Sequence, residues 1–431
     1  MALERATQTA ARRFRRPRGT NDILPEEWPY WDYVADAARR VATSFGYRRI
    51  QTPVFEDAGV FLRGVGSGTD IVEKEMYVFE DRGGDRLALR PEGTANTMRA
   101  YLEHGMANLP QPVRLFYFGS VYRYDRPQAG RYREHHQFGV EVIGDGDPMV
   151  DAEVIDLLAT LYRELGLADL TLLLNSIGDP SCRAAYLEAL RAYYGPRLEE
   201  VCADCRVRYE KNPLRLLDCK NESCQPIIGE APRITEHLCD ACRTHFDALR
   251  GFLDALEIPY AVTPTLVRGF DYYTRTVFEF VPPGEGAQST VGGGGRYDVL
   301  MEALGGPPTP GIGFGTGIER IILNLKRLGI EAPAEPPPAV YVAHTSPAAQ
   351  VEALRLAQDL RRAGLSAVVG PAGRSLKGQF RHADALRVRH VAVLGGAELA
   401  RGVVTLRSLA DGSQREAPRD QAVVWLLEAG D

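Results

Sequence analysis

A run of prolines late in the chain is the sequence feature that most limits how these 431 residues can fold. Residues 331–338 read EAPAEPPP, and proline lacks the backbone N–H that helix and sheet interiors need. A segment of this composition is stiff and solvated, as expected of a linker between domains. The sequence therefore predicts a large first domain that ends near residue 330 and a smaller second domain over residues 339–431.

The first domain has the mixed pattern of an α+β fold. Apolar residues recur with helical spacing over residues 28–45, and Gly46 follows where such a helix would end. A long amphipathic helix is expected over residues 151–165. Strands are expected at 47–55, 76–80, 87–89, 114–124, 136–143, 171–175, 260–262 and 276–280. Because residues 178–256 are rich in helical patterns and strands resume after them, this segment is predicted to be a helical insertion into the first domain.

The second domain and the N-terminus have simpler patterns. Residues 339–431 alternate strand-like and helical stretches, which predicts a small α/β unit with a largely parallel sheet. Residues 1–16 are basic but lack the apolar stretch of a secretory signal, so we expect a flexible arm on a cytoplasmic protein.

Charge and hydropathy exclude two kinds of partner. Apolar runs all fall short of the ~20 residues of a membrane-spanning helix, so a membrane partner is not expected. Proteins that bind nucleic acids without specificity are usually basic, whereas this chain has a net charge of −6. DNA is therefore not expected as a partner, and any contact with RNA must be local.

Six of the seven cysteines lie within residues 202–242. Two pairs have the CxxC spacing of zinc ligands, namely Cys202, Cys205, Cys239 and Cys242. Cytosolic thiols stay reduced and zinc favours four soft ligands, so a structural zinc site fits these cysteines better than disulfides do. The alternative interpretation is that they are small buried residues with inert thiols.

Two other stretches carry residue types suited to a nucleotide. Residues 118–144 place four arginines around a loop between strand-like segments, where guanidinium groups could grip phosphates. Residues 310–323, PGIGFGTGIERIIL, place closely spaced glycines before a helix that carries an arginine. Each stretch has a plain alternative, which is surface charge for the first and tight strand-to-helix packing for the second.

Together with residues 45–56, FGYRRIQTPVFE, these two stretches resemble the three signature motifs of class II aminoacyl-tRNA synthetases in their order and spacing. Two more peptides resemble those of the histidine enzymes in that class: LVRGFDYYTRTVFEF at 266–280 and GGGGRYD at 292–298. The resemblance implies a class II catalytic domain over residues 17–330, built on an antiparallel sheet with flanking helices. It also implies an α/β anticodon-binding domain over residues 339–431.

The same resemblance implies a histidine–tRNA ligase activity that depends on ATP and forms AMP. Such an enzyme activates L-histidine to histidyl-adenylate and pyrophosphate, with Mg²⁺ neutralising the departing group, and transfers histidine to the 3′ end of tRNA(His). A homodimer is implied as well, and Pro53 fits an edge or interface better than a sheet interior.

Two other families share parts of these patterns. The regulatory subunit of ATP phosphoribosyltransferase has the same catalytic-domain fold and binds histidine as a sensor, but it usually lacks the C-terminal domain and degrades the RGFDYY peptide. Synthetases for threonine or proline would need different pocket residues and no RGFDYY peptide. This chain has both the C-terminal domain and an intact RGFDYY peptide, as the histidine enzymes do.

The resemblance also implies roles for single residues. Glu92 and Thr94 would accept hydrogen bonds from the α-amino group of histidine. Gln137 and Glu141 share one face of a strand, and they would lie near the substrate carboxylate and read the imidazole, respectively. The implied histidine-binding residues are Glu92, Gly93, Thr94, Arg123, Gln137, Glu141, Arg268, Tyr272 and Tyr273.

The implied chemistry needs positive charge rather than a general base. The carboxylate of histidine is ionised at neutral pH and can attack the α-phosphate directly, so the protein must align it and stabilise charge on the phosphate oxygens. Arg268 and Arg123 are implied to flank the α-phosphate as catalytic residues. Arg131 and Arg320 would join Arg123 in binding ATP, by holding its β- and γ-phosphates.

Contacts with tRNA are implied at two places. Arg126 and Gln128 resemble residues that meet the acceptor end, where exposed nucleotides can be read by polar contacts. Arg374, Lys377 and Arg381 would form a basic edge of the anticodon-binding domain, although a helix with a solvated basic face would have the same sequence.

Overall fold

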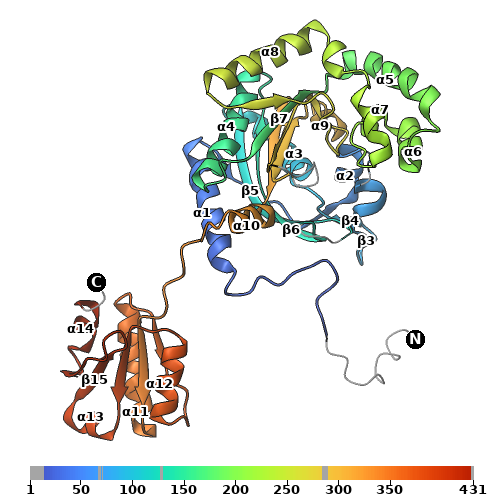
Figure 1. The fold of residues 1–431 in the computed structure, drawn as a ribbon. Coiled ribbons are helices and arrows are strands. Elements are labelled where there is room, and N and C mark those ends of the chain that lie inside the picture. The colour runs from blue at the N-terminus through green and yellow to red at the C-terminus, as the bar shows by residue number, and fades with distance from the viewer. Residues whose placement is uncertain (1–13, 67–68, 70, 127–129, 284–289, 429–431) are drawn as a thin grey trace, which may run out of the picture. The chain divides into compact units, whose positions relative to one another are not determined.

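The computed structural model describes residues 14–66, 69, 71–126, 130–283 and 290–428, and Figure 1 shows the fold. Most of the arm expected over residues 1–16, together with Gln128, lies outside these ranges. The chain divides into two compact units, one up to Pro333 and the other from Ala334 onward. Across the described ranges, no helix combines the length and the apolar character that crossing a bilayer would require.

The first unit is built on an eight-stranded sheet with the order β1-β5-β6-β11-β10-β9-β7-β8. Its strands are β1 (Arg48–Arg49), β5 (Val113–Tyr122), β6 (Glu134–Ile143), β7 (Thr171–Ser176), β8 (Tyr260–Val262), β9 (Thr274–Val281), β10 (Gly292–Arg296) and β11 (Gly311–Gly317). The five central pairings are antiparallel, and only the two outermost pairings are parallel. The predicted α+β class with an antiparallel sheet is confirmed.

The strand expected over residues 47–55 is wrong in its extent. Only Arg48–Arg49 pairs with the large sheet, as β1, and the chain leaves that sheet before Pro53. Proline cannot donate to a strand ladder, which accounts for the break. The chain then enters a separate three-stranded sheet of β2 (Phe55–Asp57), β3 (Val78–Glu80) and β4 (Arg86–Leu89).

Each face of the large sheet is covered by its own core. On one face, alternate β6 residues Phe138, Val140 and Val142 pack with helices α1 (Trp28–Ser44), α4 (Pro148–Glu164), α8 (Asp240–Ala255) and α10 (Ile318–Arg327). The other face meets α2 (Ala58–Gly64), α3 (Thr94–Glu103), α9 (Leu300–Ala303) and the part of the insertion before α8. Because side chains alternate along a strand, Gln137 and Glu141 face this second side.

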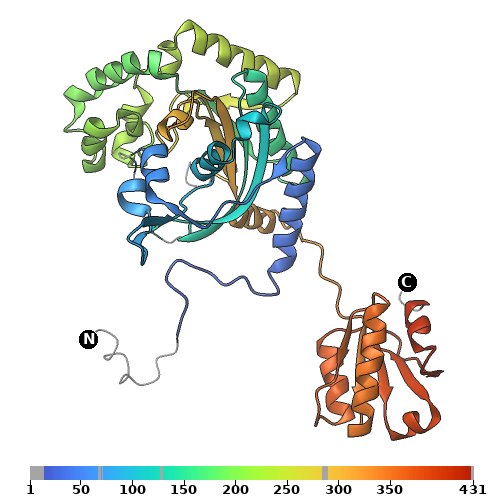
Figure 2. The ribbon, with the colours of Figure 1, turned by 180° about the vertical axis from the view of Figure 1, so that it is seen from behind.

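The segment between β7 and β8 is helical, as predicted. It contains α5 (Pro180–Tyr194), α6 (Ala203–Lys211) and α7 (Gln225–Gly229) before α8. Figures 1 and 2 show α5, α6 and α7, coloured green, gathered in one group. The apolar residues of this group belong to the same core as those of α2, α3 and α9.

The second unit has a five-stranded sheet with the order β13-β12-β14-β15-β16. Its strands are β12 (Val340–His344), β13 (Ala367–Val369), β14 (His390–Leu394), β15 (Val403–Ser408) and β16 (Gln414–Pro418), and its helices are α11 (Pro347–Arg362), α12 (Leu376–Ala385), α13 (Gly396–Arg401) and α14 (Ala422–Glu428). The parallel part predicted from the sequence comprises β13, β12 and β14. The antiparallel hairpin of β15 and β16 was not predicted, so the sheet is mixed rather than largely parallel.

Candidate active site

A cavity of about 1020 Å³ lies between the second face of the large sheet and the insertion. Strands β5, β6, β9, β10 and β11, the peptide before β9 and insertion residues from 202 to 228 all contribute to its wall. The structure places most of the predicted site residues on this wall: Glu92, Gly93, Thr94, Arg123, Arg131, Gln137, Arg268, Tyr272, Tyr273 and Arg320. Residues from distant parts of the sequence thus meet around one cavity.

Glu141 lies behind this wall and is fully buried. Its carboxylate accepts hydrogen bonds from three hydroxyls, those of Thr94 at 2.8 Å, Tyr117 at 3.2 Å and Tyr297 at 2.5 Å. Burial raises the pKa of Glu141 to about 8, against the opposing effect of these hydrogen bonds. Tyr117 and Tyr297, which also line the cavity, were not among the predicted site residues.

Glycines make room for this buried group. A Cβ on Gly313 would lie 2.0 Å from Oε2 of Glu141, and one on Gly93 or Gly139 would lie 2.3 Å from the ring of Tyr117. In residues 310–323, closely spaced glycines were expected to precede a helix, and α10 does follow them. The glycines themselves form the central strand β11, and their lack of a side chain lets Glu141 pack against the backbone.

Glu92 and Thr94, at the start of α3, form a second polar contact in the cavity. The buried carboxylate of Glu92 accepts hydrogen bonds from the backbone N–H groups of Thr94 at 2.5 Å and Ala95 at 2.7 Å. Burial raises the pKa of Glu92, while these hydrogen bonds and the charge of Arg123 act in the opposite direction. A carboxylate that accepts hydrogen bonds from the N–H groups at a helix N-terminus still has lone pairs that can accept from a further donor.

Arg268 is held against the β9 carboxylate of Glu279. The guanidinium donates to Glu279, whose other oxygen accepts a hydrogen bond from Thr290 at 2.7 Å. The buried Nε of Arg268 has no hydrogen-bond partner among the described residues. Its charged group lies 5.9 Å from the ring centre of Tyr273, so it is positioned beside the predicted amino-acid pocket.

The other three arginines predicted to bind phosphates also face the cavity. Arg123 donates to the carbonyl of Pro91 at 2.8 Å, and its guanidinium lies 5.6 Å from the ring centre of Phe270. Arg320 donates to the carbonyl of Gly130 at 3.0 Å, and burial and the nearby charge of Arg131 lower its pKa. Crowded positive charges of this kind are relieved by a polyanion, as expected of a triphosphate site.

The residues predicted to contact tRNA are placed differently. Arg126 is exposed and does not line the cavity, and Gln128 lies outside the described residues. In the second unit, Lys377 and Arg381 are exposed and lie four residues apart on α12, with exposed Arg374 just before its N-cap. This spacing gives them one face of the helix.

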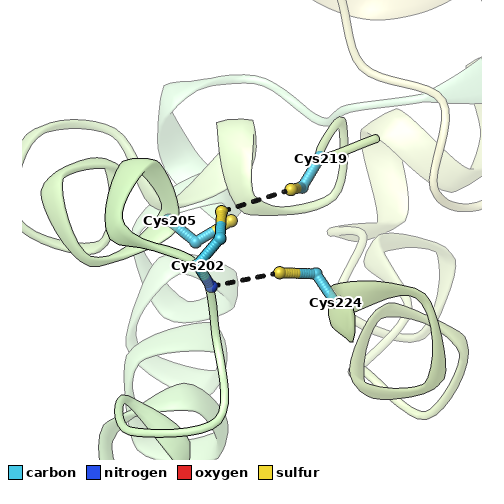
Figure 3. A group of neighbouring side chains, drawn as sticks. All are labelled: Cys202, Cys205, Cys219 and Cys224. Carbon is cyan, nitrogen blue, oxygen red and sulfur yellow. Dashed lines mark hydrogen bonds between the residues drawn. The ribbon is translucent and has the colours of Figure 1, made fainter. Parts of the chain in front are cut away.

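The predicted set of metal ligands is wrong in its grouping. The two CxxC pairs begin different helices, α6 and α8, and do not meet. One group joins Cys202 and Cys205 with Cys219 and Cys224, and Figure 3 shows these side chains. The other group joins Cys239 and Cys242 with Asp179 and Cys182.

Known proteins resemble this chain along most of its length. A family model described as Histidyl-tRNA synthetase matches residues 19–321, and one described as Anticodon binding domain matches residues 339–429. A Dehalococcoides mccartyi protein named Histidine--tRNA ligase is 54% identical over 410 residues, which cover 95% of this chain and 98% of that protein.

Solved structures show the same likeness. The crystal structure of apo histidyl-tRNA synthetase from S. aureus has a TM-score of 0.79 and 37% identity, and the match covers 96% of this chain and 99% of that one. A Bacillus halodurans structure described as an ATP phosphoribosyltransferase regulatory subunit/histidyl-tRNA synthetase is 24% identical, with a TM-score of 0.64 and coverage of 90% and 100%. At 24% identity, the match to the second structure shows a shared fold alone.

Proposed function

The chain belongs to the histidyl-tRNA synthetase family, and we propose that its cavity binds L-histidine and ATP side by side. It is an aminoacyl-tRNA ligase that activates L-histidine with ATP to histidyl-adenylate and pyrophosphate, and then transfers histidine to the 3′ end of tRNA(His). The single observation that carries the substrate assignment is the carboxylate of Glu141, which is buried behind the cavity and held by three hydroxyls.

In our proposal, Glu141 accepts a hydrogen bond from the imidazole N–H of the substrate. Tyr273 offers a hydroxyl to the same ring, and Tyr272 packs beside it, with their ring centres 4.7 Å apart. A buried polar group that is left unpaired costs free energy, so side chains without a matching N–H are rejected more strongly than size alone would allow. Glu92 and Thr94 accept from the α-amino group, beside Gly93, and Gln137 lies near the substrate carboxylate.

For activation, the substrate carboxylate attacks the α-phosphate of ATP, and pyrophosphate leaves in line with the attack. Arg268 and Arg123 stabilise the charge that spreads over the α-phosphate oxygens, and Arg131 and Arg320 hold the β- and γ-phosphates. Bound Mg²⁺ would neutralise the departing pyrophosphate. Glu75 and Glu279 on the cavity wall would hold that ion, since Mg²⁺ prefers carboxylate oxygens, and Glu279 would share its two oxygens with Arg268 and Thr290.

For transfer, the terminal ribose hydroxyl of the tRNA attacks the carbonyl carbon of histidyl-adenylate, and AMP leaves with its phosphate oxygen accepting the hydroxyl proton. Arg126 and Gln128 meet the acceptor end of the tRNA. In the second unit, Arg374, Lys377 and Arg381 present a basic edge to the anticodon loop, where splayed bases are open to contact.

We also propose that the chain works as a homodimer in the cytoplasm. The small three-stranded sheet carries exposed apolar side chains at both of its edge strands: Phe55 is on β2, with Val54 just before it, and Val78 and Phe79 are on β3. Apolar side chains exposed at sheet edges favour burial against another chain.

Amino-acid-dependent ATP–pyrophosphate exchange tests the proposed substrate. The purified protein is assayed with each of the twenty amino acids in turn, without tRNA. We expect exchange with histidine and at least about 10⁴-fold weaker exchange with the others, because a pocket that must pair polar groups discriminates on that scale. Histidine binding without exchange would instead favour a sensor role like that of the regulatory subunit.

The pKa of Glu141 predicts a stability change with pH. Burial raises this pKa from 4.5 to about 8, so between these values the folded protein keeps a proton that the unfolded chain loses. The contribution of Glu141 to the free energy of unfolding therefore falls as pH rises through this window, by up to about 1.4 kcal/mol per pH unit. Glu141→Gln cannot titrate, so the fall in melting temperature from about pH 5 to about pH 8 should shrink in that variant.

The matched control is Glu188→Gln, which changes an exposed glutamate on α5. Its melting temperature should follow the pH profile of the unmodified protein. If Glu141→Gln also keeps that profile, the titration of Glu141 does not contribute to stability in this range.

A further inference from the structure

The sulfur atoms of four cysteines in the insertion converge on one point. Cys202 and Cys205 come from the start of α6, Cys219 from the irregular segment after the 3-10 helix Pro213–Leu216, and Cys224 from the residue before α7. All four sulfurs lie within 4.8 Å of one another, and Figure 3 shows the side chains turned toward a common centre. From this convergence we infer that Cys202, Cys205, Cys219 and Cys224 bind one structural zinc ion.

The spacing of the sulfurs fits a metal better than disulfides. Four sulfurs placed tetrahedrally about zinc at ~2.3 Å are separated from one another by roughly 3.8 Å. The sulfurs of Cys202 and Cys219 are 3.7 Å apart, and all four cysteines are free thiols. A disulfide would need its two sulfurs at about 2.05 Å.

Backbone groups around the cluster point at the sulfurs. The N–H of Cys202 donates to the sulfur of Cys224 at 3.3 Å, and the N–H of Asn221 donates to that of Cys219 at 3.4 Å. Such hydrogen bonds stabilise thiolates and orient metal ligands. Cys205, Cys219 and Cys224 are buried in an apolar core, and cysteines that served only as apolar filling would have no reason to direct four sulfurs at one another.

The second group, Asp179 with Cys182, Cys239 and Cys242, is a weaker candidate and is not part of this inference. It offers three thiols, and its fourth ligand is already in use. One oxygen of Asp179 accepts hydrogen bonds from both the N–H and the hydroxyl of Ser181, at 3.0 and 2.5 Å, where it caps α5. Its other oxygen lies 3.5 Å from Arg275.

A metal at the four cysteines would fix one wall of the cavity. Cys202 and Cys219 themselves line the cavity, as do Arg208 and Arg215 between them. Residues 202–219 also contact the peptide that carries Arg268, because the side chain of Asn212 donates a hydrogen bond to Asp271 at 2.7 Å. Structural zinc sites contribute directly to folding, so loss of the ion would loosen this wall first.

The first test is the zinc content of the full-length chain by elemental analysis after dialysis. We expect at least one zinc per chain, a loss of one in the double variant Cys219→Ser/Cys224→Ser, and retention of at least one in the matched double variant Cys182→Ser/Cys242→Ser. Zinc-free protein that takes up no added zinc, or an unchanged content in the first variant, would overturn the inference.

The second test needs no variant, so it holds even if the serine substitutions prevent folding. The unmodified chain is treated with a thiol-alkylating reagent before and after a chelator, and the modified cysteines are mapped by mass spectrometry. We expect Cys202, Cys205, Cys219 and Cys224 to gain about 10-fold or more in alkylation rate after chelation, because a metal-bound thiolate is shielded. Equal rates with and without the chelator would contradict a bound metal, and neither result depends on which amino acid the cavity binds.

Discussion

Replacing Arg268 with histidine is expected to lower histidine-dependent ATP–pyrophosphate exchange by about 10³-fold or more. The expectation rests on the position of this guanidinium, which lies beside Tyr273 on the cavity wall and is held by Glu279. A charge that is already in place when negative charge develops on the phosphate lowers the activation barrier without reorganisation. Exchange kinetics at saturating histidine and ATP would measure the loss as a fall in kcat.

Two controls separate this effect from damage to the fold. Arg250→His makes the same substitution at an exposed ion pair with Asp247 on α8, away from the cavity, and should exchange like the unmodified protein. Arg268→Lys keeps a positive charge but loses the fork of donors, so it should recover only part of the rate. Near-normal exchange by Arg268→His, in a protein that melts normally, would remove Arg268 from the mechanism.

Local patterns were sufficient to predict most of the fold. The helix expected over residues 28–45 and the one expected over 151–165 correspond to α1 and α4, because apolar spacing indicates the buried face of a helix and Gly46 marks the end of α1. The start of α4 was predicted three residues too late, since the helix begins at Pro148. The strand expected over residues 47–55 failed because pairing partners decide how far a strand extends. Residues 48–49 pair with β5, whereas 55–57 pair with β4 in another sheet.

The surroundings of Glu141 could not be predicted in the same way. Tyr117 and Tyr297 are separated by 180 positions in the sequence, and they meet at Glu141 only because β5 and β6 pair in one register while Tyr297 directly follows β10. A signal was nevertheless present. The glycines of residues 292–295 and 311–317 are too frequent for ordinary strands, and they mark the places where neighbouring groups approach the backbone closely, such as the side chains of Tyr297 at Gly311 and Glu141 at Gly313.

The cysteines show the limit of motif spacing. A CxxC pair identifies two ligands that a helix start can bring together, but its other partners depend on the tertiary fold. Cys219 and Cys224 complete the first pair, and Asp179 and Cys182 approach the second. From spacing alone, the two CxxC pairs were predicted to form one site, whereas the structure places them in separate groups.

The largest stability effect is expected from Asp151→Ala, since Asp151 lies at the centre of a fully buried polar network. Its carboxylate accepts hydrogen bonds from Arg296 at 2.5 Å and Thr276 at 2.6 Å, and pairs with His245 at 2.8 Å. Both Asp151 and Arg296 are 0% exposed. Removing Asp151 leaves the buried charge of Arg296 with Asp298, at 3.2 Å, as its remaining carboxylate partner among the described residues. Breaking a buried ion pair costs about 3–5 kcal/mol, so calorimetry should show a fall in melting temperature on the order of 10 °C.

The position of this network also ties stability to the substrate pocket. Arg296 is the last residue of β10, and the next residue, Tyr297, donates to Glu141. We therefore expect the KM for histidine in the exchange reaction to rise in Asp151→Ala, measured at a temperature where the variant is folded. Asp156→Ala removes a partly exposed carboxylate from the same helix and should change the free energy of unfolding by less than about 1 kcal/mol. If Asp151→Ala melts like that control, then Asp298 alone compensates the buried charge of Arg296, to which it lies within 3.2 Å.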